Sequence, residues 1–75
     1  MNTQELTSAE QEILIEIKYA NNKYIGIESV IKLFGGNYND KSDKSFARAI
    51  LSDMSNRKLI TRFYNSFGQD CYRLN

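Results

Sequence analysis

The longest amphipathic pattern in the chain lies between residues 43 and 57. At about 100° per residue, with Ile50 taken as the centre of the buried side, apolar and polar positions separate onto two faces. The apolar face comprises Phe46, Ala47, Ala49, Ile50, Leu51 and Met54, and the polar face comprises Lys44, Ser45, Arg48, Ser52, Ser55 and Asn56. Ser42 or Asp43 is expected to cap the first turn, because either side chain can accept a hydrogen bond from an unpaired backbone N–H group. The pattern predicts a helix over about 43–57.

The next segment, about 59–74, has the spacing of a β-hairpin. Thr61 and Arg62 separate the apolar and aromatic pairs Leu59-Ile60 and Phe63-Tyr64, a change of period that is typical of a strand. Turn-forming residues follow from 65 to 70, and the last residues can return as an antiparallel partner. We therefore predict two strands joined by a turn.

Two shorter helical patterns come earlier in the chain. Thr7 and Glu10 have the spacing of a capping box. After this cap, apolar residues line one helical face, which predicts a first helix over about 8–21. The face consists of Leu6, Ala9, Ile13, Ile17 and Ala20. The alternation of Ile13, Ile15, Ile17 and Tyr19 is also typical of a strand, but the cap and the apolar face favour a helix.

A second helix is predicted over about 27–34, where apolar residues recur at helical spacing and Gly35-Gly36 supplies a stop signal. Tyr24 and Ile25 are predicted to form a very short strand before it. Residues 35–42 then form a loop, which either contains a short helical turn or is an insertion that reaches a ligand.

Composition restricts the function classes. A chain of 75 residues makes one small domain, here 1–75, with little room for an enclosed active site. It has no histidine and one cysteine, and it contains neither a phosphate-binding glycine loop nor a cluster of metal ligands. We expect no enzymatic activity, no cofactor and no metal.

The charge is unevenly distributed. Three lysines against five glutamates give residues 1–36 a net charge of −2, and seven cations against four aspartates give residues 37–75 a net charge of +3. This asymmetry favours an anionic partner for the second half of the chain.

The sequence also bears on location. Cys71 cannot form an intramolecular disulfide, because it is the only cysteine, and this favours a reducing compartment. Residues 1–12 lack the pattern of a signal peptide, and no apolar run approaches about 18 residues. We expect a soluble, cytoplasmic protein with no membrane partner.

The predicted order of helix, short strand, helix, helix, strand, strand resembles the winged helix-turn-helix superfamily over nearly the whole chain. Within this superfamily the chain resembles the small regulators that phages, plasmids and other mobile elements encode. The resemblance implies an α+β, mainly α fold of three helices with a C-terminal two-stranded hairpin as the wing. Two features depart from the superfamily pattern. The loop 35–42 is longer than the turn of three or four residues in a compact helix-turn-helix. The predicted wing tip, residues 67–70, has no basic side chain.

The resemblance implies DNA binding through the third helix, most strongly through Arg48 with Lys44 beside it. These residues, Ser45 and Ser52 would face the major groove, where arginine can form two hydrogen bonds to guanine. Phosphate contacts are expected from Lys41, Arg62 and Arg73. The alternative for all of these side chains is an ordinary solvated surface. Arg57 and Lys58 are better explained by favourable interaction with a helix C-terminus.

Apolar and aromatic residues give further candidates. Ile15 and Tyr19 lie opposite the buried face of the first helix, so they either form a homodimer or partner contact or are covered by the N-terminal arm or the wing. Tyr64, Phe67 and Tyr72 either stack on unpaired bases or complete the core.

The predicted function is therefore DNA binding, preferably to duplexes, by a small transcriptional regulator or a replication or recombination accessory factor. The alternatives are a protein interaction module, such as an inhibitor or adaptor encoded by a phage or mobile element, and a single-stranded DNA binder.

Overall fold

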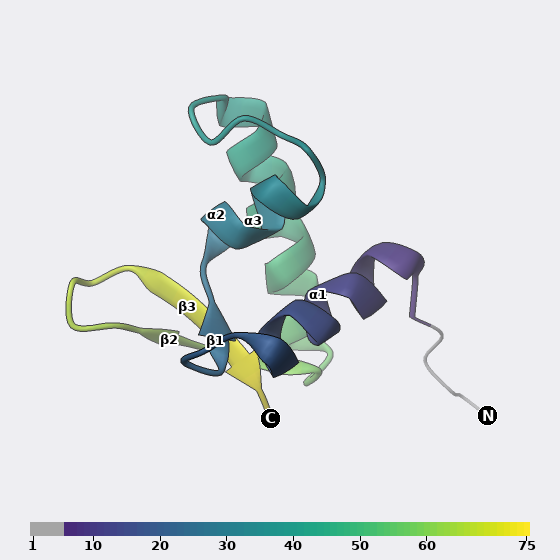
Figure 1. The fold of residues 1–75 in the computed structure, drawn as a ribbon, viewed down its shortest axis with the longest axis vertical. Coiled ribbons are helices and arrows are strands. Elements are labelled where there is room, and N and C mark those ends of the chain that lie inside the picture. The colour runs from purple at the N-terminus through teal and green to yellow at the C-terminus, as the bar shows by residue number, and fades with distance from the viewer. Residues whose placement is uncertain (1–5) are drawn as a thin grey trace.

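The computed structural model describes residues 6–75, which form three helices and a three-stranded antiparallel sheet (Figure 1). The elements in chain order are α1 (Ser8–Tyr19), β1 (Tyr24–Ile25), α2 (Ile27–Leu33), α3 (Lys41–Asn56), β2 (Ile60–Tyr64) and β3 (Asp70–Leu74). The small α+β fold, the three helices and the short strand at Tyr24–Ile25 are as predicted. The hairpin β2–β3 extends to one side of the helices (Figure 1).

The first helix begins at the predicted cap. The Thr7 side chain accepts a hydrogen bond from the Glu10 backbone N–H at 3.1 Å, and the Glu10 carboxylate accepts one from the Thr7 N–H at 3.0 Å. This reciprocal pair satisfies two backbone donors that a helix start leaves unpaired. The helix ends at Tyr19, two residues earlier than predicted.

The cap predicted for the third helix was wrong. Asp40, rather than Ser42 or Asp43, caps α3, because its carboxylate accepts from the N–H groups of those two residues at 2.8 and 3.3 Å. The Asp43 carboxylate instead accepts from the Asn37 N–H at 2.8 Å. As a result α3 starts at Lys41 and not at 43, and it ends at Asn56.

The connection between α2 and α3 is a loop without a helix of its own. Gly35 has φ +71°, a left-handed conformation that suits glycine at a helix end. Its N–H donates to Lys32 O at 3.1 Å, and the Gly36 N–H donates to Ile31 O at 2.8 Å, so α2 ends in a Schellman motif. One turn follows, closed by the Asp40 N–H and Asn37 O at 3.0 Å. The prediction of a hidden helical turn was therefore wrong.

The last strand lies in the middle of the sheet. The strand order is β1-β3-β2, with Ile25 opposite Tyr72 on one side and Arg62 opposite Tyr72 on the other. Because side chains alternate between the faces of a strand, the pairing Tyr64–Asp70 shares the face of Arg62 and Tyr72. The opposite face carries Thr61, Phe63, Cys71 and Arg73.

The core lies where α1, α2 and α3 meet the sheet. Its buried apolar side chains are Ile13, Ile17, Ile25, Val30, Ile31, Ala47, Leu51, Met54, Ile60 and Tyr72.

Two residues of α3 that were predicted to be buried are exposed, namely Phe46 and Ala49. The buried side of α3 is centred on Ala47, Leu51 and Met54, so Phe46 falls at its edge. Its ring is 54% exposed and packs edge-on against Phe34, with the ring centroids 5.8 Å apart.

Candidate nucleic-acid interface

One flank of α3 carries a row of cations. Lys41, Lys44 and Arg48 recur at helical spacing and lie within about 60° of one another around the helix. With Ser45 and Ser52 between them they form what we call the basic flank. All of its side chains are exposed apart from Lys44, which is half-buried.

The acidic side chains of α3 point elsewhere. At about 100° per residue, both Asp43 and Asp53 lie at least about 100° around the helix from the three cations of the basic flank. Asp53 pairs with Arg57 at 3.1 Å, and Arg57 also forms an ion pair with Glu10 of α1. Arg57 therefore joins the end of α3 to α1, which supports a structural role for this residue.

The long loop reaches the basic flank through Tyr38. The Lys44 ammonium lies 4.9 Å from the centre of the Tyr38 ring, a distance at which a cation is attracted to the face of an aromatic ring. This contact holds Lys44 over the loop while leaving its charge unneutralised. The predicted insertion thus supplies one aromatic side chain to the candidate interface.

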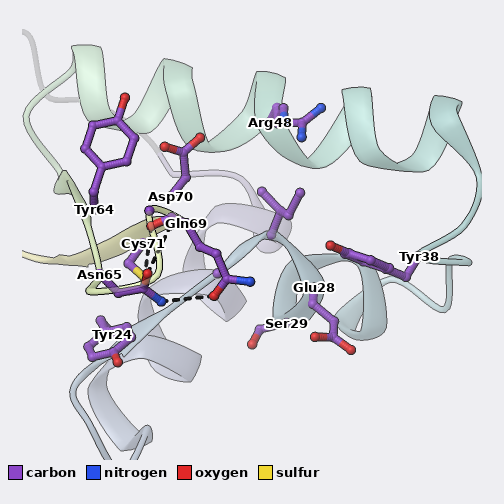
Figure 2. A pocket seen from close by; sticks show the side chains of 13 residues that line it. Tyr24, Glu28, Ser29, Tyr38, Arg48, Tyr64, Asn65, Gln69, Asp70 and Cys71 are labelled. Carbon is purple, nitrogen blue, oxygen red and sulfur yellow. Dashed lines mark hydrogen bonds between the residues drawn. The ribbon is translucent and has the colours of Figure 1, made fainter.

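A groove of about 500 Å³ runs between the basic flank and the hairpin (Figure 2). Arg48 lies on the α3 side, and Tyr38 lies at one end of the groove. The side chains of Tyr64 and Asp70 point from the hairpin towards α3 (Figure 2). The groove is lined by Tyr24, Gly26, Ile27, Glu28, Ser29, Tyr38, Arg48, Tyr64, Asn65, Gly68, Gln69, Asp70 and Cys71.

The charged side chains that line this groove are of both signs. Arg48 is the cation of the lining and lies on the α3 side. Glu28 of α2 lies away from α3, whereas the Asp70 carboxylate points from the hairpin towards α3 (Figure 2). A phosphate in the groove is attracted by Arg48 and repelled by both carboxylates.

The strand register separates the two arginines of the hairpin. Arg62 lies on the face that turns towards α3, with its guanidinium 5.6 Å from the centre of the Tyr64 ring. It also lines a second hollow of about 360 Å³ with Ser55 of α3. Arg73 lies on the opposite face, over the Phe63 ring at 6.0 Å. The structure therefore brings Arg62, but not Arg73, to the side of the basic flank.

Tyr72 links this surface to the core. Burial raises the pKa of its hydroxyl above the ordinary value of 10.0, and the Asp70 carboxylate raises this pKa further. The charge and hydrogen bonding of Arg62 act in the opposite direction, as does the charge of Arg48. Burial also raises the pKa of the Cys71 thiol. Tyr72 is therefore a core residue, whereas Tyr64 remains 62% exposed.

The turn of the hairpin is ordered by one side chain. Asn65 Oδ1 accepts hydrogen bonds from the N–H groups of Phe67 and Gln69 at 2.9 and 3.0 Å, and Asn65 Nδ2 donates to Gln69 Oε1 at 3.0 Å. Gly68 completes the turn with φ +76°. The sequence marked Asn65 only as a turn former, and its role in fixing the backbone around Phe67 was missed.

The candidate dimer residues Ile15 and Tyr19 are both exposed on α1, at 55% and 74%. The hairpin does not cover them. The N-terminal arm that could cover them includes residues 1–5, which lie outside the described part of the chain.

No protein-family model, curated protein or solved structure matches this chain. None of the helices within residues 6–75 has the length and apolar character required to span a bilayer.

Proposed function

We propose that this protein is a winged-helix DNA-binding protein that holds duplex DNA against the basic flank of α3. The observation that carries the proposal is the row of Lys41, Lys44 and Arg48, which is accompanied by serines and free of α3 carboxylates. A helix fits the major groove of B-DNA, which is about 12 Å wide. Cations aligned on one exposed flank can therefore contact bases and phosphates together.

Each cation has a task in this proposal. Arg48 is the last cation of the row and can form two hydrogen bonds to guanine, so it reads sequence. Lys41 and Lys44 contact phosphates or base edges, and Arg62 contacts phosphate from the hairpin. Arg73 lies on the other face of the sheet, and we leave it outside the interface. The cellular role that we propose is transcriptional regulation or an accessory role in replication or recombination.

The test is binding of a labelled duplex by fluorescence anisotropy across a salt series. Up to three phosphate contacts, from Lys41, Lys44 and Arg62, predict a slope of log K against log salt of roughly −3. We expect Lys44→Ala and Arg48→Ala each to weaken binding several-fold. Losing a phosphate contact also makes the slope shallower by about 0.9, whereas losing a base contact leaves the slope unchanged and relaxes sequence preference.

Lys18→Ala is the matched control, because it removes the same charge from an exposed position on α1. It should bind like the wild type. All three variants should keep the thermal midpoint, since none of these side chains is buried. Unchanged affinity in both Lys44→Ala and Arg48→Ala would remove α3 from the interface.

A second candidate function is suggested by the carboxylates of Glu28 and Asp70. They repel phosphate from the part of the groove away from Arg48 and suit a basic peptide of a partner protein. Absence of binding to any DNA at low salt would favour this interaction module over the DNA-binding proposal.

A further inference from the structure

The end of the hairpin presents a single aromatic ring to solvent. Phe67 is 84% exposed, the highest value among the exposed large hydrophobic side chains of residues 6–75. Its backbone is nevertheless held, because Asn65 Oδ1 accepts from its N–H at 2.9 Å and the Gly68 N–H donates to Asn65 O at 3.0 Å. The backbone that carries the ring is therefore ordered, while the ring itself projects into solvent and adds nothing to the core.

The chemistry of the turn excludes phosphate as its ligand. Ser66, Phe67, Gly68 and Gln69 carry no charge, and Asp70 follows them. An exposed ring without cations suits an apolar, flat partner. A nucleobase is such a partner, since aromatic side chains stack on bases of any sequence. Bases within a duplex are already stacked, so the base that Phe67 can receive is an unpaired one.

The turn is continuous with the basic flank. Arg48 and the turn residues Asn65, Gly68 and Gln69 line the same groove (Figure 2), so a nucleic acid seated on α3 reaches the end of the hairpin. The exposed Tyr64 ring lies along this path.

We propose that the hairpin end is a second binding site, in which Phe67 stacks on an unpaired base of a single strand extending from the duplex. This inference rests on the proposed binding of the duplex by α3. It predicts a preference for duplexes with a single-stranded tail over blunt duplexes.

The experiment compares a blunt duplex with the same duplex carrying a short thymine tail, by fluorescence anisotropy. The wild type should bind the tailed duplex at least about fivefold more tightly than the blunt one. This factor is the lower end of the gain in affinity expected from stacking on one base. Phe67→Ala should bind both duplexes equally, with the blunt-duplex affinity of the wild type. Ser66→Ala, a neighbouring exposed position, should keep the preference.

A tryptophan at the same position gives a direct readout of stacking. The chain contains no tryptophan, so Phe67→Trp introduces a single fluorophore. The emission of this tryptophan should be quenched by the tailed duplex and not by the blunt one. The Phe67→Trp variant should prefer the tailed duplex at least as strongly as the wild type does.

The outcomes separate the two proposals. A wild type that binds both duplexes equally, or a preference that survives in Phe67→Ala, overturns the stacking site and leaves duplex binding by α3 intact. A wild type that binds neither duplex overturns both.

Discussion

At the scale of single residues, Tyr72 shows how the candidate interface depends on the core. It lies in the central strand, opposite Ile25 of β1 and Arg62 of β2, and its side chain is buried. The protonated hydroxyl is favoured in the folded state, because burial and the nearby Asp70 raise its pKa. Folding therefore depends on pH in the alkaline range.

We predict that stability falls as the pH rises past about 10, because the unfolded state then loses the Tyr72 proton before the folded state does. Below the unfolded pKa the stabilisation is fully present. Tyr72→Phe has no such proton, so its urea midpoint should fall less than that of the wild type between about pH 8 and about pH 11. The raised pKa of Cys71 also lowers the stability, starting near pH 9, and this effect is present in both proteins. Equal falls of the urea midpoint in the two proteins would contradict the assignment of the remaining loss of stability to Tyr72.

Single residues also show where sequence reasoning was insufficient. Phe46 was placed in the core because Ile50 was taken as the centre of the buried side of its helix. The true centre is shifted towards Ala47 and Leu51, where the sheet packs. A helical pattern gives the width of an apolar face, but the elements packed against it decide which edge of that face is covered.

At the scale of elements, the start of α3 sets the direction of the basic flank. The Asp40 carboxylate holds the first turn, and Lys41 is the next residue. The cap therefore fixes the helix end that presents the first cation.

We expect Asp40→Ala to destabilise the protein by about 1 kcal/mol, since two N–H groups lose their acceptor. For a domain of this size the thermal midpoint should fall by roughly 4 to 8 °C. Asp40→Asn keeps an accepting oxygen and should retain most of the stability. If thermal melts show that Asp40→Asn is as unstable as Asp40→Ala, the charge and not the cap is the stabilising feature.

Element order was readable from the sequence because each element has a local signal. The capping box at Thr7, the short strand at Tyr24 and the stop at Gly35 are all encoded within a few residues. The loop between α2 and α3 was not readable to the same degree. Asp43, an apparent cap, is used instead to hold the Asn37 N–H across the loop, a contact that depends on how the loop folds back.

At the scale of the whole molecule, the basic flank and the exposed apolar pair of α1 belong to different elements, which are joined by the Arg57–Glu10 ion pair. A single small domain with few phosphate contacts binds DNA modestly. We propose that a second copy binds through Ile15 and Tyr19, since paired domains would contact two sites on one duplex.

Ile15→Asp should convert a dimer into a monomer, because it places an unpaired charge in the apolar contact that Ile15 and Tyr19 would form with the second copy. Light scattering at several concentrations measures the change. Glu12→Ala, an exposed position on the same helix, should leave the dimer intact. A wild type that is monomeric at the highest concentration would end this proposal.

The composition of the candidate site could be predicted only in part. Lys44 and Arg48 share a flank because helical spacing requires it. Lys41 joins them only because the Asp40 cap starts α3 two residues earlier than predicted. The separation of Arg62 from Arg73 depends on strand register, which no local pattern in the hairpin specifies. The groove depends on three segments that are distant in sequence, so neither its carboxylates nor Tyr38 could be assigned in advance.

The position of β3 in the middle of the sheet has a consequence for synthesis. Both β1 and β2 pair with this strand, and they do not pair with each other. All three helices precede β3 in the chain, and neither outer strand has a partner until residues 70–74 have emerged. The sheet therefore assembles after release of its central strand, and until then the edge of Tyr24–Ile25 is open to pairing with other chains.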